Sequence, residues 1–499
     1  MKLFSGHQIK DWDQFTIVNE PISSIDLMER ASRQFTYWFI KKFDNPNVPV
    51  VIFCGNGNNG GDGLAVARLL RNEMYDVQVY ILRFAPKDSA DFETNLMRLQ
   101  QLGDMKITFI DDYFPNLTKN SLIIDALMGT GVNRRVEGTL SELIRNINLT
   151  PNRKISIDLP SGLPSEGECL GDTIMADQIF TFQLPKLSFF LKVNAKYCCS
   201  WQVSDIGLHP MYLESVDSKV YTIDLAYAKS LYRPRQKHTH KGDFGHAAIV
   251  AGCKSTFGAA MLSAKACIKS GAGLVTAFVP NTASLTLLGF APEVMISACG
   301  EDFLQDCNAD WTKYTIGVGP GLGQRNETAH LIKTILTTSL KPIVIDADGL
   351  NILAEHSDWL PLIPRDSILT PHPKEMERLF GRTNSEIKQI ELAKKMAQKY
   401  QINIVLKGAF TRIFTPTGME YINTTGNPGM ATAGAGDVLT GIITSLLAQG
   451  YGSKEAAILG VYVHGLAGDF AISGQSHESL IASDIIYHLG DAFKQVAMK

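Results

Sequence analysis

The stretch Asn423–Ile442, NTTGNPGMATAGAGDVLTGI, passes from a turn-rich loop into the apolar helix pattern of residues 438–447. This helix should begin at the small residues AGAG, 433–436, where backbone N–H groups lie uncovered at the positive end of the helix dipole. Such a helix start suits a phosphate. Asp437 is the one ionisable group in this run, and it could take a proton from a hydroxyl that attacks a phosphoryl group. The alternative is that Asp437 only caps the helix.

The composition of the whole chain is that of an ordinary globular protein. It has 499 residues, of which 45% are hydrophobic and 19% charged, with a formal net charge of −3. The length predicts two or three domains. The chain has no excess of basic residues that would indicate binding to nucleic acid. No apolar run approaches the roughly 20 residues of a membrane span. The N-terminus lacks a signal-peptide core and the 8 cysteines form no CxxC pair, so we expect reduced thiols in a cytoplasmic protein.

A glycine-rich loop follows the first buried-strand pattern, VPVVIFC at residues 48–54. It reads GNGNNGGDG over residues 55–63 and leads into a helix pattern, as in the first unit of a dinucleotide-type α/β fold. Two details disagree with an NAD-dependent dehydrogenase. Asp62 inside the loop would repel a pyrophosphate, and the next strand pattern ends in Arg83 instead of an acidic residue. The loop therefore predicts a ligand site of another kind, the alternative being a structural glycine turn.

Two further strand patterns each end in an aspartate that is followed by a glycine turn. Asp125 precedes ALMGTGVNRR, and Asp158 precedes LPSGL. Because the carboxyl ends of parallel strands meet at one edge of an open sheet, both aspartates should converge with the glycine loop on a binding crevice. Oxygen atoms of Asn59, Asp125 and Ser161 form a candidate cation site, and Asp158 is the candidate acid–base group.

The motifs GNGNNGGDGL, DALMGTGVNRR and DLPSGL resemble those of the NAD(P)HX epimerase family, the YjeF N-terminal domain, over nearly all of residues 1–212. The resemblance implies interconversion of the two epimers of hydrated NADH and NADPH at the ring carbon that bears the hydroxyl. It also implies a potassium ion held by Asn59, Asp125 and Ser161. The substrate contacts that it implies are Asn58, Asn59, Gly60, Gly61, Asp62, Gly129, Thr130, Gly131, Val132, Asn133, Arg134, Arg135 and Asp158.

The character of the chain changes after residue 205. A basic, proline-marked stretch, RPRQKHTHK at residues 233–241, is typical of a solvated connector, the alternative being a stretch that neutralises phosphates. We place a linker over residues 213–224, between domains at 1–212 and 225–499. The helical apolar pattern near the N-terminus should cover a sheet or form a subunit contact, so a homo-oligomer is expected.

Strand and helix patterns alternate again after residue 245 and predict a second doubly wound parallel α/β domain. Glycine loops at its strand ends allow a ligand close to the backbone, and Lys407 is a candidate anion contact. A lone histidine such as His372 is more often a packed structural residue than a ligand. All these loops should lie on the same face as Asp437. They read GPGLG at 319–323, DADGLN at 346–351, TPHPKEM at 370–376 and KGAFT at 407–411.

The strand-end lysine, the glycine-rich pocket and the GAGD aspartate together resemble the ribokinase-like fold. FGAAMLSAKA, SGAGLV, GPGLG, DADGLN, TPHPKEM, LKGAFT and NPGMATAGAGDVLTGI resemble, more narrowly, the ADP- or ATP-dependent NAD(P)HX dehydratase family over about residues 225–499. The resemblance implies phosphorylation of the ring hydroxyl with Mg²⁺ on the nucleotide phosphates, followed by expulsion of phosphate. Implied contacts to the hydrated nicotinamide are Ala259, Gly321, His372 and Asp437. Implied contacts to the adenine nucleotide are Lys407, Gly408, Ala409, Phe410, Thr411 and Gly436.

The expected architecture is therefore two doubly wound α/β domains, the first Rossmann-like and the second ribokinase-like. The two resemblances imply consecutive steps on NADHX and NADPHX: epimerisation, then dehydration of the S epimer at the expense of adenine nucleotide. No nucleic-acid or membrane partner is expected. One rival is a ribokinase-like kinase for a small alcohol, with an N-terminal nucleotide sensor. The other is a first domain that binds a ligand or a protein without turnover.

Overall fold

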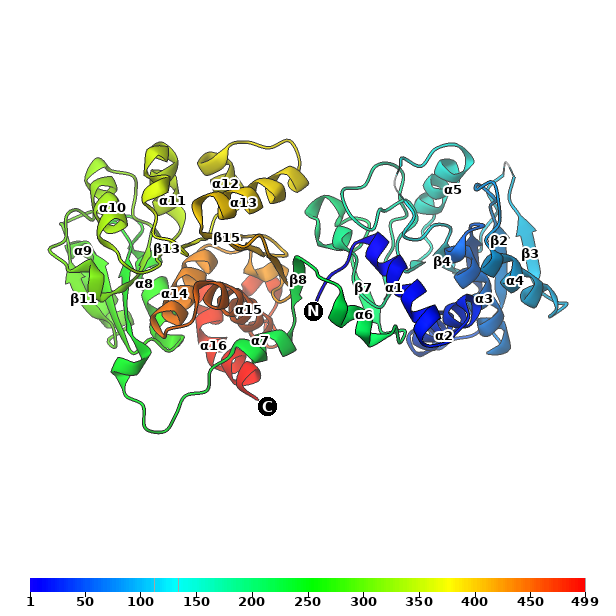
Figure 1. The fold of residues 1–499 in the computed structure, drawn as a ribbon, viewed down its shortest axis with the longest axis horizontal. Coiled ribbons are helices and arrows are strands. Elements are labelled where there is room, and N and C mark those ends of the chain that lie inside the picture. Colours follow the sequence, from blue (N-terminus) through cyan, green and yellow to red (C-terminus); the bar gives the residue numbers. More distant parts are fainter. Residues whose placement is uncertain (112, 133, 499) are drawn as a thin grey trace. The chain divides into compact units, whose positions relative to one another are not determined.

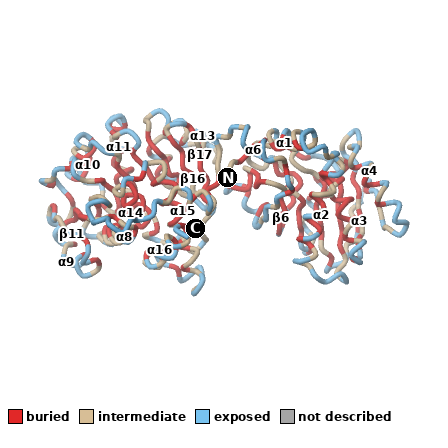
Figure 2. Tube along the Cα trace, turned by 60° about the horizontal axis from the view of Figure 1, so that its bottom comes forward, coloured by how far each residue is buried: buried red, intermediate tan, exposed pale blue. Residues whose placement is uncertain are grey.

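The chain forms two compact units in the computed structural model, which describes residues 1–111, 113–132 and 134–498. Lys2–Ser218 make up the first unit, and Lys219–Lys499 with Met1 make up the second. Each unit contains one mainly parallel sheet covered by helices (Figure 1), which confirms the expected α/β class. Buried residues follow the strands and the inner sides of the helices in each unit (Figure 2).

The first unit is built on a seven-stranded parallel sheet with the order β3-β2-β1-β4-β5-β6-β7. All five residues of β1 are buried, because helices cover both faces of the sheet. The strand order reverses between β1 and β4, which opens a crevice at the carboxyl ends of these strands. The strands are β1 (Val50–Cys54), β2 (Val77–Ile81), β3 (Lys106–Phe109), β4 (Leu122–Ala126), β5 (Lys154–Ile157), β6 (Gln178–Phe182) and β7 (Trp201–Ser204).

The N-terminal helices of this unit pack on its sheet. A capping box of Ser5 and Gln8 starts α1. Phe35 and Phe39 on α2 are fully buried, and the Phe35 ring meets Phe180 of β6 edge to face at 5.5 Å. The apolar face of α2 thus packs within the first unit. Self-association of the chain stays a prediction. The helices are α1 (Gly6–Asn19), α2 (Ser24–Lys42), α3 (Asn58–Asn72), α4 (Ala90–Gln100), α5 (Gly138–Leu149) and α6 (Pro210–Ser215).

The second unit is built on a ten-stranded sheet with the order β11-β10-β9-β12-β13-β14-β15-β16-β17-β8. It differs from the expected parallel sheet in β16, which is antiparallel to both neighbours. Its first strand, β8, lies within the stretch 213–224 expected as a linker. The strands are β8 (Val220–Ile223), β9 (His246–Val250), β10 (Leu274–Val279), β11 (Met295–Ala298), β12 (Thr315–Val318), β13 (Val344–Ile345), β14 (Ile368–Leu369), β15 (Asn403–Leu406), β16 (Arg412–Phe414) and β17 (Glu420–Asn423).

The most deeply buried helix of the second unit is α14, which packs between the sheet and α8 and is drawn almost wholly as buried in Figure 2. Gly441 permits this packing, because a side chain there would overlap the carbonyl oxygen of Ser263 on α8. The helices are α7 (Leu225–Leu231), α8 (Phe257–Lys269), α9 (Asn281–Phe290), α10 (Asn326–Thr338), α11 (Ala347–Glu355), α12 (Pro373–Phe380), α13 (Glu386–Tyr400), α14 (Ala435–Ala448), α15 (Ser453–Ala471) and α16 (Ala482–Ala497).

The cysteines correct one expectation from the sequence. Cys299 and Cys307 are joined by a disulfide after β11, so the expectation that all eight thiols are reduced is wrong for this pair. The segment between them turns back and brings their Cα atoms to 5.4 Å, a proximity that their spacing does not reveal. The other six cysteines are free. In the described part of the chain, no helix is long and apolar enough to cross a membrane.

Candidate functional site

A cavity of about 470 Å³ lies at the carboxyl ends of the strands in the first unit. The residues that line it come from the glycine loop before α3, from the segments after β2, β4, β5, β6 and β7, and from α1. The predicted substrate contacts that line it are Asn58, Asn59, Asp62, Gly129, Thr130, Gly131 and Asp158. Gly60, Gly61, Val132, Arg134 and Arg135 are not among its lining residues, and Asn133 lies outside the described residues.

The glycine loop shapes this cavity through close packing. A Cβ on Gly60 would overlap the Gly55 carbonyl oxygen, so Gly60 packs against the loop's own backbone. Helix α3 begins at Asn58 without a side-chain cap. Its first N–H groups therefore remain available beside the cavity, which is the arrangement that favours an anion.

Burial resolves the difficulty that Asp62 presents in the sequence. Asp62 is half-buried, and desolvation raises the pKa of its carboxyl group well above the ordinary value, with Asp158 and Asp13 adding to the rise. The neutral form is favoured. Asp62 therefore does not place a negative charge beside an anionic ligand at the glycine loop.

Asp158 is held firmly at the end of β5. Its backbone is left-handed, with φ of 63°. The Oδ1 atom accepts hydrogen bonds from Thr181 Oγ1 at 3.1 Å, the Phe182 amide at 3.0 Å and Lys186 Nζ at 2.6 Å. Lys186 is 1% exposed, and its ammonium also donates to the carbonyls of Phe182 and Leu184. One oxygen of Asp158 is thus fixed, while Oδ2 has no donor among the described residues.

The structure adds Asp13, which the sequence analysis missed. This residue lies on α1 and lines the cavity together with Ile9, one helical turn earlier. Burial raises the pKa of Asp13 to about 7, with Asp158 adding to the rise and Lys186 opposing it. An aspartate within an amphipathic helix gives no local signal of such a role, because only the fold brings α1 to the strand ends.

The predicted cation ligands Asn59, Asp125 and Ser161 lie together around Met128. Ser161 Oγ donates to Asp125 Oδ1 at 2.5 Å and accepts from the Met128 amide at 2.8 Å, while Asn59 Nδ2 donates to the Met128 carbonyl at 2.8 Å. Burial raises the pKa of Asp125, and hydrogen bonds from Ser161 oppose this rise. Carboxylate, hydroxyl, amide and carbonyl oxygens without a nitrogen or sulfur donor fit a hard cation such as potassium.

In the second unit, α14 begins as the sequence predicts. Gly434 has φ of 87° at the N-cap and gives no side-chain cap, so the N–H groups of the first turn remain available to a ligand. Asp437 stands in this turn. Burial raises the pKa of Asp437 to about 7, and Asp346 adds to the rise while Lys407 opposes it. A carboxylate with this pKa is suited to general-base catalysis near neutral pH.

Lys407 lies beside this helix start at the end of β15. Its Nζ is 2.7 Å from Asp346 Oδ1 and 3.7 Å from Glu375 Oε2, and Thr440 on α14 donates to Asp346 Oδ2 at 2.7 Å. Burial alone would lower the pKa of Lys407, but Asp346 and Glu375 outweigh it and raise the pKa. A Cβ built on Gly436 would lie 3.5 Å from Lys407 Nζ. The structure therefore brings Lys407, Gly436 and Asp437 together, as expected.

The turn after Lys407 is open to solvent. Gly408 and Ala409 are exposed, and Phe410 and Thr411 are half-buried. The turn leads from β15 into β16, and the Gly408 amide donates to Thr411 Oγ1 at 3.3 Å. This part of the predicted nucleotide contact is thus an accessible backbone loop next to the ammonium group of Lys407.

His372, Gly321 and Ala259 occupy neighbouring loops. His372 starts α12, where its Nδ1 accepts from the amides of Lys374 at 3.1 Å and Glu375 at 3.2 Å. Burial lowers the pKa of His372, and the neutral ring serves as a cap. Gly321 has φ of 61°, and a Cβ there would lie 3.0 Å from the Ala259 side chain. Of the predicted contacts to the hydrated nicotinamide, only Gly321 and Ala259 are thus shown to adjoin each other.

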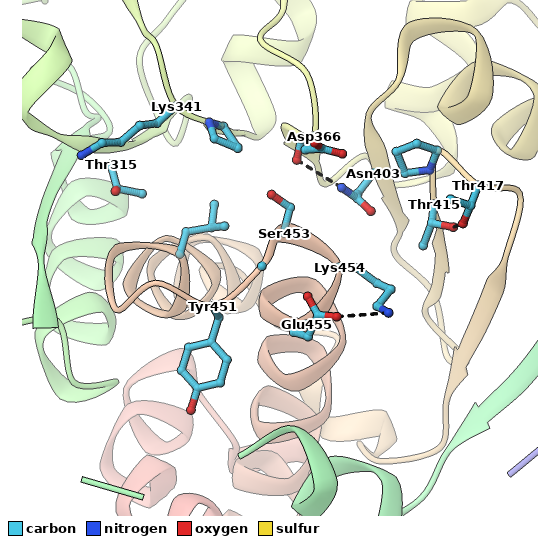
Figure 3. A pocket seen from close by; sticks show the side chains of 14 residues that line it. Thr315, Lys341, Asp366, Asn403, Thr415, Thr417, Tyr451, Ser453, Lys454 and Glu455 are labelled. Carbon is cyan, nitrogen blue, oxygen red and sulfur yellow. Dashed lines mark hydrogen bonds and ion pairs between the residues drawn. The ribbon is translucent and has the colours of Figure 1, made fainter. Parts of the chain in front are cut away.

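A second cavity, of about 520 Å³, lies at the amino ends of β12 and β15, and Figure 3 shows the side chains that line it. Thr315 and Asn403, which begin β12 and β15, line it together with Tyr451 and Ser453. None of the predicted site residues lines it. This cavity is therefore separate from the predicted site at the start of α14.

Comparisons with known proteins agree with both resemblances. A family described as NAD(P)H-hydrate dehydratase matches residues 247–489, and one described as YjeF-related protein N-terminus matches residues 24–188. A bifunctional NAD(P)H-hydrate repair enzyme from Moorella thermoacetica is 36% identical over 506 aligned residues, covering 97% of this chain and 95% of the relative. One from Escherichia coli is 32% identical over 441 residues, covering 87% and 83%.

Among solved structures, the ADP/ATP-dependent NAD(P)H-hydrate dehydratase from Bacillus subtilis, co-crystallised with ATP and Mg²⁺, is 27% identical. The match covers 56% of this chain and 99% of that chain, with a TM-score of 0.48. The relatives from Moorella and Escherichia match across both units. The chain therefore belongs to the family of bifunctional NAD(P)H-hydrate repair enzymes.

Proposed function

We propose that this chain returns hydrated NADH and NADPH to the reduced coenzymes in two steps. The first unit interconverts the R and S epimers, and the second unit dehydrates the S epimer with ADP or ATP as co-substrate. The observation that carries the proposal is the position of Asp437 beside Gly436 and Lys407, where an uncapped helix start and a cation adjoin a carboxylate whose pKa is about 7.

In the second unit, the amides at the start of α14 and Lys407 would bind the terminal phosphates of the nucleotide. Asp437 would remove the proton of the ring hydroxyl as its oxygen attacks the terminal phosphorus. Phosphate is a far better leaving group than hydroxide, so the lone pair of the ring nitrogen can then expel it. Loss of a proton from the adjacent ring carbon completes the carbon–carbon double bond of the dihydropyridine.

Two metal ions complete the proposed chemistry. Mg²⁺ would neutralise the nucleotide phosphates, and the carboxylates of Asp346 and Glu375 beside Lys407 are oxygen donors of the kind it prefers. In the first unit, Asn59, Asp125 and Ser161 would hold K⁺. Both ions, like the homo-oligomer and the location in the cytoplasm, remain predictions from the sequence.

The proposal is tested by supplying mixed hydrates of NADH with ADP or ATP and following the absorbance of the reduced nicotinamide. The wild-type chain should convert both epimers into NADH, and Asp437→Asn should convert neither. Asp158→Asn should convert only the S epimer. A stable phosphorylated product in place of free phosphate would instead support a small-molecule kinase.

A further inference from the structure

An epimerase for these hydrates must act on both faces of one ring. The hydroxyl of the R epimer and that of the S epimer point to opposite faces of the nicotinamide ring. A single carboxyl group fixed on one side of the ring reaches only one of the two hydroxyls. Asp158 is such a fixed group, because three donors hold its Oδ1.

A second carboxyl group lines the same cavity from a different element. Asp13 lies on α1, whereas Asp158 and Lys186 follow the strands β5 and β6. The two carboxyls influence each other, since Asp158 contributes to the raised pKa of Asp13. Among the described residues, Asp13 has no hydrogen-bond or ion-pair partner, so its carboxyl group is not engaged in holding the fold.

We propose that Asp13 and Asp158 act as an acid–base pair across the nicotinamide ring, each serving the hydroxyl on its own face. This inference rests on the epimerase activity proposed above and names a second catalytic residue for it. Asp13 also lies outside residues 24–188, the part that the YjeF-related family matches.

The chemistry balances without any external oxidant or reductant. One carboxylic acid donates its proton to the ring hydroxyl, and the lone pair of the ring nitrogen expels water and forms an iminium ion. A water molecule then adds to the opposite face of the same carbon and gives its proton to the other carboxylate. The proton ends on the other carboxyl group of the pair, so the reverse reaction uses the same two groups in exchanged roles.

The charges around the pair set its resting state. Asp158 Oδ1 lies 2.6 Å from Lys186 Nζ. Asp13 has no such partner, and burial leaves it with a pKa of about 7, so both of its forms are populated at neutral pH. Desolvation favours the neutral form of Asp62, and Lys10 is the remaining charged residue among the described residues that line the cavity. Asp13 can therefore either give or take a proton at neutral pH.

The test uses the full-length chain without nucleotide, so that dehydration is idle, and purified single epimers of NADHX in ¹⁸O-labelled water. Chromatography follows the epimer ratio, and mass spectrometry follows entry of ¹⁸O into the hydroxyl. We expect Asp13→Asn and Asp158→Asn each to slow epimerisation about 100-fold or more. Each variant should still exchange ¹⁸O into one epimer above the uncatalysed rate, and the two variants should retain different epimers.

A matched control is Asp11→Asn, which changes an exposed aspartate on the same helix and should leave both rates unchanged. Near-normal epimerisation by Asp13→Asn would overturn the proposal. So would loss of exchange in both epimers by a variant that still binds the hydrate, since that indicates a structural role. If the wild-type chain itself leaves the epimer ratio unchanged, the epimerase assignment fails and the pairing fails with it, whereas a wild-type chain that epimerises beside an unaffected Asp13→Asn variant overturns the pairing alone.

Discussion

Asp437, the proposed general base of the dehydration, should lower the stability of the second unit. Its folded-state pKa of about 7 exceeds the ordinary value of 3.8, so the folded state prefers the protonated carboxyl. Below about pH 4 the carboxyl is protonated in both the folded and the unfolded state and costs no stability. As the pH rises towards 7, ionisation in the unfolded state lowers the free energy of unfolding. Asp437→Asn should raise the free energy of unfolding of the second unit by roughly 1–3 kcal/mol at pH 8 while abolishing dehydration. Urea unfolding at pH 8 and pH 4 checks this, and a destabilised variant at pH 8 would contradict it.

The same carboxyl predicts the pH dependence of catalysis. A general base works only when ionised, so kcat/KM for dehydration should fall about tenfold for each pH unit below the pKa of Asp437, which lies at about 7. The rate should level off above it. Initial rates between pH 5 and 9, with nucleotide and Mg²⁺ saturating, measure this profile. A rate that stays flat down to pH 5 would exclude Asp437 as the base.

At the scale of elements, the start of α14 carries the proposed anion site. Gly436→Ala adds a methyl group 3.5 Å from Lys407 Nζ and 3.8 Å from Asp346 Oδ2, which the protein itself tolerates. Since alanine favours a helix over glycine by about 1 kcal/mol, the variant should be at least as stable as the wild type. Its KM for nucleotide should nevertheless rise about tenfold or more, because the methyl group enters the space of the phosphate.

The matched control for this change is Gly474→Ala, in an exposed loop where a Cβ meets nothing within 4 Å. It should leave both KM and stability unchanged. Thermal unfolding and steady-state kinetics of the two variants separate an effect on the anion site from a general effect of adding a methyl group. An unchanged KM in Gly436→Ala would place the phosphates elsewhere.

Strand-end loops are also the elements that sequence predicts best. Asp158, Lys407 and Asp437 follow strands or open helices with strong local patterns, and the structure places them at the expected edges. Asp13 was missed because its role depends on where α1 packs, which is a tertiary property. The charge state of Asp62 was misjudged for the same reason, since burial and not sequence sets it. The Cys299–Cys307 pair likewise depends on a chain reversal that the spacing of the two cysteines does not reveal.

At the scale of the whole molecule, the two chemistries belong to separate compact units. Chains that carry Asp158→Asn should repair only the S epimer, and chains that carry Asp437→Asn should repair neither. An equimolar mixture of the two variants should again repair both epimers, because free hydrate can diffuse from one chain to the other. Recovery of reduced nicotinamide from a pure R epimer measures this complementation. Failure of the mixture would mean that the hydrate must pass within one chain.

The position of β8 has a consequence for biosynthesis. This strand pairs in parallel with β17, although Val220 precedes Glu420 by about two hundred residues. A ribosome adding about 5–20 residues per second exposes β8 for at least ten seconds before its partner emerges. The first unit can fold during that interval, while β8 of the second unit remains without its partner strand β17. Chaperones that shield exposed strands should therefore associate with nascent chains that end before residue 420.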